Sequence, residues 1–185
     1  MTTIYLLRHG EVHNPEGIIY GHLPGYRLSE NGRAEISSAA EMLSVRGPFD
    51  ALLTSPLERA QESAGIVAER LELTPVIEPL LAETDVSGYQ GKPFSCLPTP
   101  YITENGVPGI EGAASLRARM IGWVASARAY ERVIAVSHRD PIAMLLLHWT
   151  GKGLDNLAGL TLPTGSLHEV HLDGAAVRLS GPALG

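Results

Sequence analysis

Short apolar runs of β-forming residues alternate along this chain with longer segments of helical periodicity, and few folds accommodate that alternation. The runs at 3–7, 50–55 and 132–138 are rich in Val, Ile, Leu and Tyr and predict buried strands. A weaker strand is expected at 74–79. Strands that alternate with helices favour a mostly parallel sheet covered by helices on both faces. The expected fold class is therefore a three-layer α/β/α sandwich.

Between the strands, the apolar residues recur at the spacing of helices that bury one face. One helix is expected from Ser29, a favourable N-cap residue, to about Arg46, and another covers 113–130. The segments 166–172 and 175–180 are expected to form a β-hairpin, because the Asp-Gly pair between them is a strong hairpin signal.

Two further helices have start signals of their own. Ser55 with Glu58 matches a capping box, and Pro56 would occupy the first helical position. The last helix is expected at 140–151, with Asp140 as its cap. Both starts directly follow predicted strands, so their side chains would lie at the edge of the sheet.

The segment 88–112 is rich in proline and glycine and predicts no regular structure. Loops of this length are usually functional covers or disordered. We expect 88–112 to form an irregular cover over the functional site. We expect the whole chain, 1–185, to be a single domain, because its length suits one hydrophobic core.

Composition excludes several classes of partner. The formal net charge of −6 argues against binding to nucleic acids or to membrane surfaces, which are both polyanionic. A single cysteine cannot form an intramolecular disulfide. No signal peptide and no apolar run of about 18 residues is recognised, so a cytoplasmic location is expected.

Polar residues follow three of the predicted strands at the point where each strand ends. Arg8-His9 follows the first strand, Arg59 lies one turn beyond the second, and His138-Arg139 follows the strand at 132–138. In open α/β sheets, ligands bind beyond the carboxyl ends of the strands. Guanidinium groups and imidazoles gathered there predict an anion site, and phosphate suits the bidentate arginine fork.

Four blocks in this order resemble the histidine phosphatase superfamily, in its phosphoglycerate-mutase-like branch with the Arg-His-Gly signature. The blocks are LLRHGEV, LTSPLERAQESA, LLAETDVSGYQGK and AVSHRDPI. The resemblance runs from residue 4 to about residue 150 and implies the phosphoglycerate-mutase-like fold.

The resemblance also implies catalytic roles. His9 matches the nucleophile that becomes phosphohistidine, and Arg8, Arg59 and His138 match the residues that clamp the phosphoryl oxygens. Glu83 stands where many members carry the acid that protonates the leaving group.

These roles agree with elementary chemistry. A histidine attacks phosphorus only when it is neutral, and the neighbouring cations Arg8 and Arg59 should lower the pKa of His9. The same cations would stabilise the charge of the transition state, so neither a metal nor another cofactor is required. Glu83 must keep its proton near neutral pH to act as an acid.

The chain departs from the common family pattern around the expected phosphate site. Asn14 is a candidate phosphate contact although the loop before it is one residue shorter than usual. Gly21 is expected to offer its backbone N–H to the substrate, with His22 nearby. Arg139 either binds a second acidic group of the substrate or pairs with Asp140.

The leading hypothesis is a cofactor-independent phosphatase that hydrolyses a small phosphomonoester. A mutase is the runner-up, but the short cover favours water as the acceptor. A non-catalytic phospho-ligand binder would be expected to lack His9 or an arginine. A metallohydrolase is set aside because no His-Glu-x-x-His motif occurs, and His168 and His171 point to opposite faces of one strand. The sequence predicts neither the particular ester nor the oligomeric state.

Overall fold

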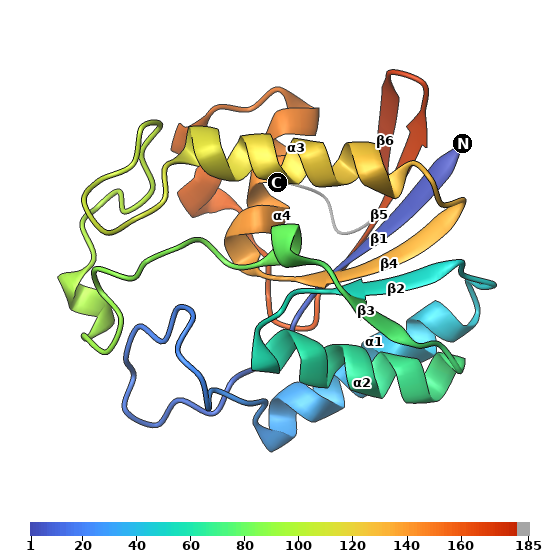
Figure 1. The fold of residues 1–185 in the computed structure, drawn as a ribbon, viewed down its shortest axis with the longest axis horizontal. Coiled ribbons are helices and arrows are strands. Elements are labelled where there is room, and N and C mark those ends of the chain that lie inside the picture. The colour runs from blue at the N-terminus through green and yellow to red at the C-terminus, as the bar shows by residue number, and fades with distance from the viewer. Residues whose placement is uncertain (181–185) are drawn as a thin grey trace.

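The computed structural model describes residues 1–180, which are organised around one mixed sheet of six strands (Figure 1). The strand order is β3-β2-β4-β1-β5-β6. Strands β1 to β4 pair in parallel, and the C-terminal hairpin adds β5 and β6 in antiparallel orientation. The strands are β1 (Thr2–Arg8), β2 (Ala51–Thr54), β3 (Pro75–Ile77), β4 (Arg132–Ser137), β5 (Leu167–Asp173) and β6 (Ala176–Ser180).

Helices cover both faces of the sheet, so the predicted three-layer α/β/α architecture is confirmed. Figure 1 shows α1 (Glu30–Ser44) and α2 (Glu58–Leu71) below the sheet, and α3 (Ala113–Ala127) and α4 (Arg139–Thr150) above it. Three short 3₁₀ helices occur in the connections, at η1 (Pro79–Leu81), η2 (Phe94–Cys96) and η3 (Leu154–Gly159). No helix within residues 1–180 is long and apolar enough to cross a membrane.

Alternating side chains of the central strand supply the cores of both layers. Ile4 and Leu6 pack into the core beneath α3 and α4, whereas Tyr5 and Leu7 pack into the core beneath α1 and α2. All four side chains are fully buried. Each such side chain contributes about 1.5–3 kcal/mol through its removal from water, so β1 is held firmly between two cores.

The parallel register brings three strand ends to one edge of the sheet. Arg8, at the end of β1, pairs with Ser137, at the end of β4. Thr54, at the end of β2, pairs with Val136 of the same β4 strand. The residues that follow these strands must therefore emerge side by side. The loop after β1 and the loops that precede α3 also lie at one end of the molecule in Figure 1.

The predicted capping box at the start of α2 is wrong. The helix begins at Glu58 after Leu57, which offers no side-chain cap, and Pro56 precedes the helix. Glu58 instead pairs with Arg27, at 3.3 Å. The hydroxyl of Ser55 is directed to a histidine in the site described below. Ser55 and Glu58 therefore make tertiary contacts instead of forming a capping box.

Other boundaries also differ from the predictions. Asp140 is not the cap of α4, because His138 is the N-cap residue and Asp140 lies in the first turn. Ser29 does cap α1, by accepting a hydrogen bond from the N–H of Gly32 at 3.0 Å. The helix that Ser29 begins ends at Ser44, two residues earlier than expected.

Candidate active site

His9 leaves the end of β1 with its ring buried and its tautomer fixed. Its side chain is 2% exposed. The Nδ1 atom lies 2.8 Å from the carbonyl oxygen of Gly10, and a carbonyl can only accept, so Nδ1 carries the hydrogen. Nε2 is then the unprotonated nitrogen, and it accepts a hydrogen bond from Nε of Arg59 at 3.3 Å. The lone pair on Nε2 is thus unprotonated and is held in the hydrogen bond from Arg59.

The surroundings of His9 keep this ring neutral. Burial lowers the pKa of His9 well below its ordinary value, and the charges of Arg59 and then Arg8 lower it further. The hydrogen bond to Gly10 raises this pKa, but its effect is weaker than those of burial and of the Arg59 charge. At neutral pH the imidazole is therefore uncharged.

The glycine of the Arg-His-Gly signature is required by a close approach of two backbones. A Cβ atom added to Gly10 would lie 2.3 Å from the carbonyl oxygen of Gly32 in α1. A Cβ atom on Gly32 would in turn lie 2.1 Å from the carbonyl oxygen of Glu11. The N–H of Gly10 also donates to the hydroxyl of Ser63, at 3.2 Å. These contacts fix the backbone that directs the His9 ring.

Two arginines bring positive charge to the nucleophile. Arg59, on the first turn of α2, is 1% exposed and donates through Nη2 to the carbonyl of Gly21 at 3.0 Å. Its guanidinium lies 4.8 Å from the centre of the Tyr20 ring, which holds it by a cation–π contact. Arg8 donates through Nη1 to the carbonyl of Leu162. Its Nε is buried and has no partner among the described residues.

His138 completes the group at the end of β4. Its ring centre lies 5.0 Å from that of His9, and the residue is fully buried. Its Nε2 lies 2.7 Å from the hydroxyl of Ser55, while its Nδ1 has no partner among the described residues. Burial and the charge of Arg59 lower the pKa of His138 well below its usual value. This imidazole is therefore also neutral.

Glu83 follows η1 and lies across the cavity as a half-buried carboxyl group. Burial, followed by the negative charge of Asp140, raises its pKa to about 7. Its Oε1 accepts from the N–H of Thr84 at 2.9 Å. Its backbone carbonyl accepts from Nε2 of His22 at 2.8 Å and from Nη2 of Arg119 at 3.2 Å. The backbone is thus anchored, and the carboxyl can hold a proton near neutral pH.

A cavity of about 260 Å³ lies above these groups. It is lined by Arg8, Ile19, Tyr20, Gly21, Arg59, Glu83, Thr84, Val86, Phe94, Leu97, Tyr101, Arg139 and Asp140. His9 and His138 are buried and are not among the lining residues, but Arg59, which donates to His9, is one of them. Three lining residues, Phe94, Leu97 and Tyr101, come from the segment 88–112, so this segment does form a wall of the cavity.

Only two of the four predicted substrate contacts lie at the cavity. Gly21 and Arg139 line the cavity, whereas Asn14 and His22 do not. The amide group of Asn14 is bonded on both sides to the backbone of Ile18, at 2.9 and 3.3 Å. Of the two alternatives for Arg139, the pairing with Asp140 is present, at 3.0 Å. The binding role of Asn14 and His22 stays a prediction.

Sequence reasoning did not assign several polar groups of this site. The sequence places Ser55 at a strand end beside Arg59, but it predicts for this side chain no role other than a helix cap. Tyr20 and Thr84 gave no signal in the sequence, because nothing local distinguishes them from loop residues. Thr84 is fully buried, and its hydroxyl has no partner among the described residues.

Within residues 1–180, no three His, Cys, Asp or Glu side chains are grouped as ligands for a metal ion.

Comparison with known proteins identifies the family. Residues 4–182 match the histidine phosphatase superfamily (branch 1). The chain belongs to this superfamily. This histidine phosphatase chain is 37% identical over 168 residues to an uncharacterized protein of Mycobacterium tuberculosis, Rv0525, covering 83% of this chain and 81% of that protein.

Two further comparisons place the chain among phosphatases. It is 27% identical over 186 residues to the adenosylcobalamin/alpha-ribazole phosphatase of Salmonella typhimurium, covering 92% of this chain and 85% of that protein. The solved structure of a mycobacterial glucosyl-3-phosphoglycerate phosphatase, Rv2419c, superposes with a TM-score of 0.82 and 23% identity, covering 98% of each chain. That second likeness confirms the histidine phosphatase fold.

Proposed function

We propose that this chain is a cofactor-independent phosphatase that hydrolyses a small phosphomonoester through a phosphohistidine on His9. The observation that supports this most directly is the neutral, buried His9 ring, whose unprotonated Nε2 lies 3.3 Å from Nε of Arg59. Relatives that are named as phosphatases support hydrolysis as the reaction.

The first step transfers the phosphoryl group to the enzyme. When the ester binds, the Nε–H of Arg59 turns from Nε2 of His9 to a phosphoryl oxygen, which frees the nitrogen lone pair. Nε2 then forms a bond to phosphorus while the bond from phosphorus to the alcohol oxygen breaks. Glu83 gives its proton to that oxygen, so the alcohol leaves neutral and Glu83 becomes a carboxylate.

Positive charge and hydrogen-bond donors stabilise this step. The guanidinium groups of Arg8 and Arg59 neutralise the oxygens of the phosphoryl group as it passes between the alcohol oxygen and Nε2. The Nδ1–H of His138 supplies a further donor. These groups are held by the fold before substrate arrives, so little reorganisation is required in the transition state.

The second step returns the enzyme to its starting state. Water gives a proton to the Glu83 carboxylate and attacks phosphorus, and the bond between phosphorus and Nε2 breaks. The products are inorganic phosphate, a neutral His9 and a protonated Glu83. No cofactor enters either step.

The test compares the wild type with His9→Asn on a panel of phosphomonoesters. The wild type should release phosphate, and the variant should lose at least about 10³-fold in kcat/KM because it has no nucleophile. Rapid acid-free quenching of wild-type turnover should trap an acid-labile, base-stable phosphoryl group on the protein. Equal activity of the two proteins would refute the assignment of His9. Binding without turnover by the wild type would indicate a non-catalytic receptor, and isomerisation faster than phosphate release would indicate a mutase.

The cavity volume and the two arginines support a small phosphorylated molecule as the substrate. The cytoplasmic location and the single-domain organisation expected from the sequence stay predictions.

A further inference from the structure

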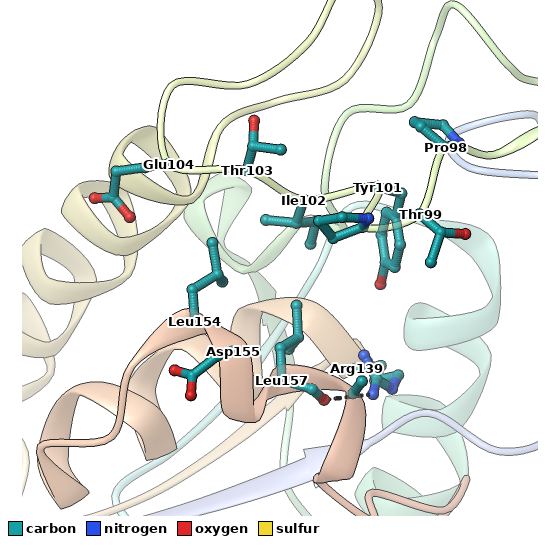
Figure 2. A pocket seen from close by; sticks show the side chains of 12 residues that line it. Pro98, Thr99, Tyr101, Ile102, Thr103, Glu104, Arg139, Leu154, Asp155 and Leu157 are labelled. Atoms are coloured by element: carbon teal, nitrogen blue, oxygen red, sulfur yellow. Dashed lines mark hydrogen bonds between the residues drawn. The ribbon is translucent and has the colours of Figure 1, made fainter.

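A second and larger cavity, of about 680 Å³, adjoins the catalytic cavity. Figure 2 shows it between the cover segment that carries Thr99 to Glu104 and the 3₁₀ helix η3, which carries Leu154 and Leu157. Its lining residues are Pro98, Thr99, Pro100, Tyr101, Ile102, Thr103, Glu104, Arg139, Leu154, Asp155, Leu157 and Ala158. Tyr101 and Arg139 line both cavities, so the two spaces share a wall.

The volumes of the two cavities indicate how much of a substrate each one can hold. Pockets that enclose a drug-sized ligand usually measure about 300–1,000 Å³. The catalytic cavity, at about 260 Å³, lies below this range, while the second cavity, at about 680 Å³, lies well inside it. The catalytic cavity accommodates the phosphoryl group and the first atoms of the alcohol. A larger alcohol would extend toward the second cavity, which shares Tyr101 and Arg139 with the first.

The shared wall is tied to the acid that would protonate the alcohol oxygen. The hydroxyl of Tyr101 donates to both oxygens of Asp140, at 2.7 and 2.9 Å. Arg139 donates to Asp140 at 3.0 Å and to the carbonyl of Leu157 at 3.0 Å, and the second of these bonds is drawn in Figure 2. Asp140 in turn raises the pKa of Glu83. The two residues that line both cavities, Tyr101 and Arg139, are thus bonded to the carboxylate that faces Glu83 electrostatically.

The walls of the second cavity select the chemistry of its occupant. Most of its lining is apolar, with proline rings on the cover side and Leu154 and Leu157 on the η3 side. Of its two carboxylates, Glu104 is paired with Arg117 at 2.8 and 3.1 Å, so Asp155 is the lining residue whose charge disfavours a second anionic group. Arg139 is the one basic residue in this lining, and its guanidinium is already bonded to Asp140 and to a carbonyl.

From this arrangement we infer that the second cavity binds the alcohol portion of the substrate, and that the preferred substrate is a phosphomonoester of a bulky, mainly apolar alcohol without a second anionic group. This inference rests on the proposed phosphatase function. It assigns specificity to residues of η3 and of the cover segment, which do not touch the phosphoryl group.

The first experiment measures wild-type kcat/KM for ethyl, butyl, hexyl and octyl phosphate. Leaving-group basicity is nearly constant along this series, so a trend reports binding of the chain. Each fully buried methylene is worth about threefold to fourfold, and we expect hexyl phosphate to exceed ethyl phosphate by at least about tenfold. A hexyl phosphate that ends in a carboxylate should lose most of that gain, because Asp155 lines the cavity and Arg139 is already bonded to Asp140.

The second experiment fills or polarises the cavity from the η3 side. Ala158→Trp occupies its volume, and Leu154→Asp places a charge on its apolar wall. Both should lower the ratio of hexyl to ethyl kcat/KM toward one while leaving ethyl phosphate turnover within about twofold of the wild type. Ala125→Trp, at an exposed position of α3 outside either cavity, is the matched control and should keep the wild-type ratio.

The outcomes separate the two proposals. If no alkyl phosphate is hydrolysed and no phosphohistidine forms, the proposed function itself fails. If ethyl phosphate is hydrolysed but the alkyl series is flat, the phosphatase stands and the role of the second cavity is refuted. A ratio that neither Ala158→Trp nor Leu154→Asp changes would refute it equally, and thermal unfolding of each variant confirms that the protein measured is folded.

Discussion

The Nε2 atom of His138 lies 2.7 Å from the hydroxyl oxygen of Ser55, in a fully buried pair. The same hydroxyl accepts the N–H of Leu57 at 3.2 Å, and no other acceptor for its hydrogen is recorded among the described residues. The hydroxyl therefore donates to Nε2, and the ring carries its own hydrogen on Nδ1. Nδ1 has no protein partner in the described residues, and in the proposed mechanism its hydrogen is donated to a phosphoryl oxygen. Ser55 thus acts as a positioning residue for His138.

Replacing Ser55 by alanine should release His138 from this tautomer. We expect kcat/KM to fall by about tenfold to a hundredfold, and inhibition by inorganic phosphate to weaken, since one donor to the phosphoryl oxygens is no longer oriented. Steady-state kinetics and phosphate inhibition constants would measure both effects. Ser37→Ala, on the exposed face of α1, is the control. Unchanged phosphate inhibition in Ser55→Ala would contradict the tautomer assignment.

The acid role of Glu83 predicts a dependence on the leaving group. Glu83→Gln should lower kcat/KM for alkyl phosphates by about 10²–10⁴-fold, because an alkoxide cannot leave without a proton. The loss for 4-nitrophenyl phosphate should be much smaller, since nitrophenolate leaves unprotonated. Wild-type kcat/KM for alkyl phosphates should also fall as the pH rises above about 7, where Glu83 loses its proton, and this limb should be absent in Glu83→Gln. Equal losses on both substrates would argue against the acid role.

The same carboxyl group predicts a pH-dependent stability difference. The pKa of Glu83 is raised from 4.5 to about 7 on folding, so the folded protein holds this proton more tightly than the unfolded chain. The stability that this provides is complete below pH 4.5 and is lost as the pH rises to about 7. Glu83→Gln cannot titrate, and its free energy of unfolding relative to the wild type should rise by about 1–3 kcal/mol between pH 4.5 and pH 8. Denaturant titrations at the two pH values test this, and a constant difference would contradict it.

The close approach of Gly10 to Gly32 predicts a large cost for one added methyl group. The obstructing atom is a backbone oxygen at 2.3 Å, which cannot move without shifting α1. Gly10→Ala should therefore destabilise the protein by about 2–4 kcal/mol and displace the His9 ring. In α2, Gly65 has nothing within 4 Å of an added Cβ atom, so Gly65→Ala is the control and should stabilise the protein by about 0.5–1 kcal/mol. Similar melting temperatures for both variants would contradict this account.

Much of the fold could be predicted because periodicity and burial agree along the chain. The apolar runs that become β1, β2 and β4 are buried on both faces, so each stands out in the sequence. The start of α2 could not be predicted in the same way. Ser55 and Glu58 satisfied a local capping pattern, but His138 and Arg27 compete for the same side chains from distant parts of the chain.

Part of the candidate site could be predicted from the sequence in the same way, and part could not. Arg8, His9, Arg59 and His138 could be predicted together because parallel strands must end at one edge of the sheet. The position of Tyr20 beside Arg59 could not, since it depends on the path of an irregular loop. The second cavity could not be predicted either, because it needs η3, whose residues show no distinct hydrophobic period.

The two cavities are built from different kinds of structure. The groups proposed for phosphoryl transfer stand on strand ends and first helical turns, which two hydrophobic cores hold in place. The far walls of the second cavity come from a 3₁₀ helix and a proline-rich loop, in which Ile102 and Leu157 belong to a core whereas Thr99 and Ala158 are exposed. Substitutions at Thr99 or Ala158 should therefore change which alcohol is preferred while the reaction itself stays intact. A scaffold divided in this way is a favourable starting point for directed evolution of new ester selectivities.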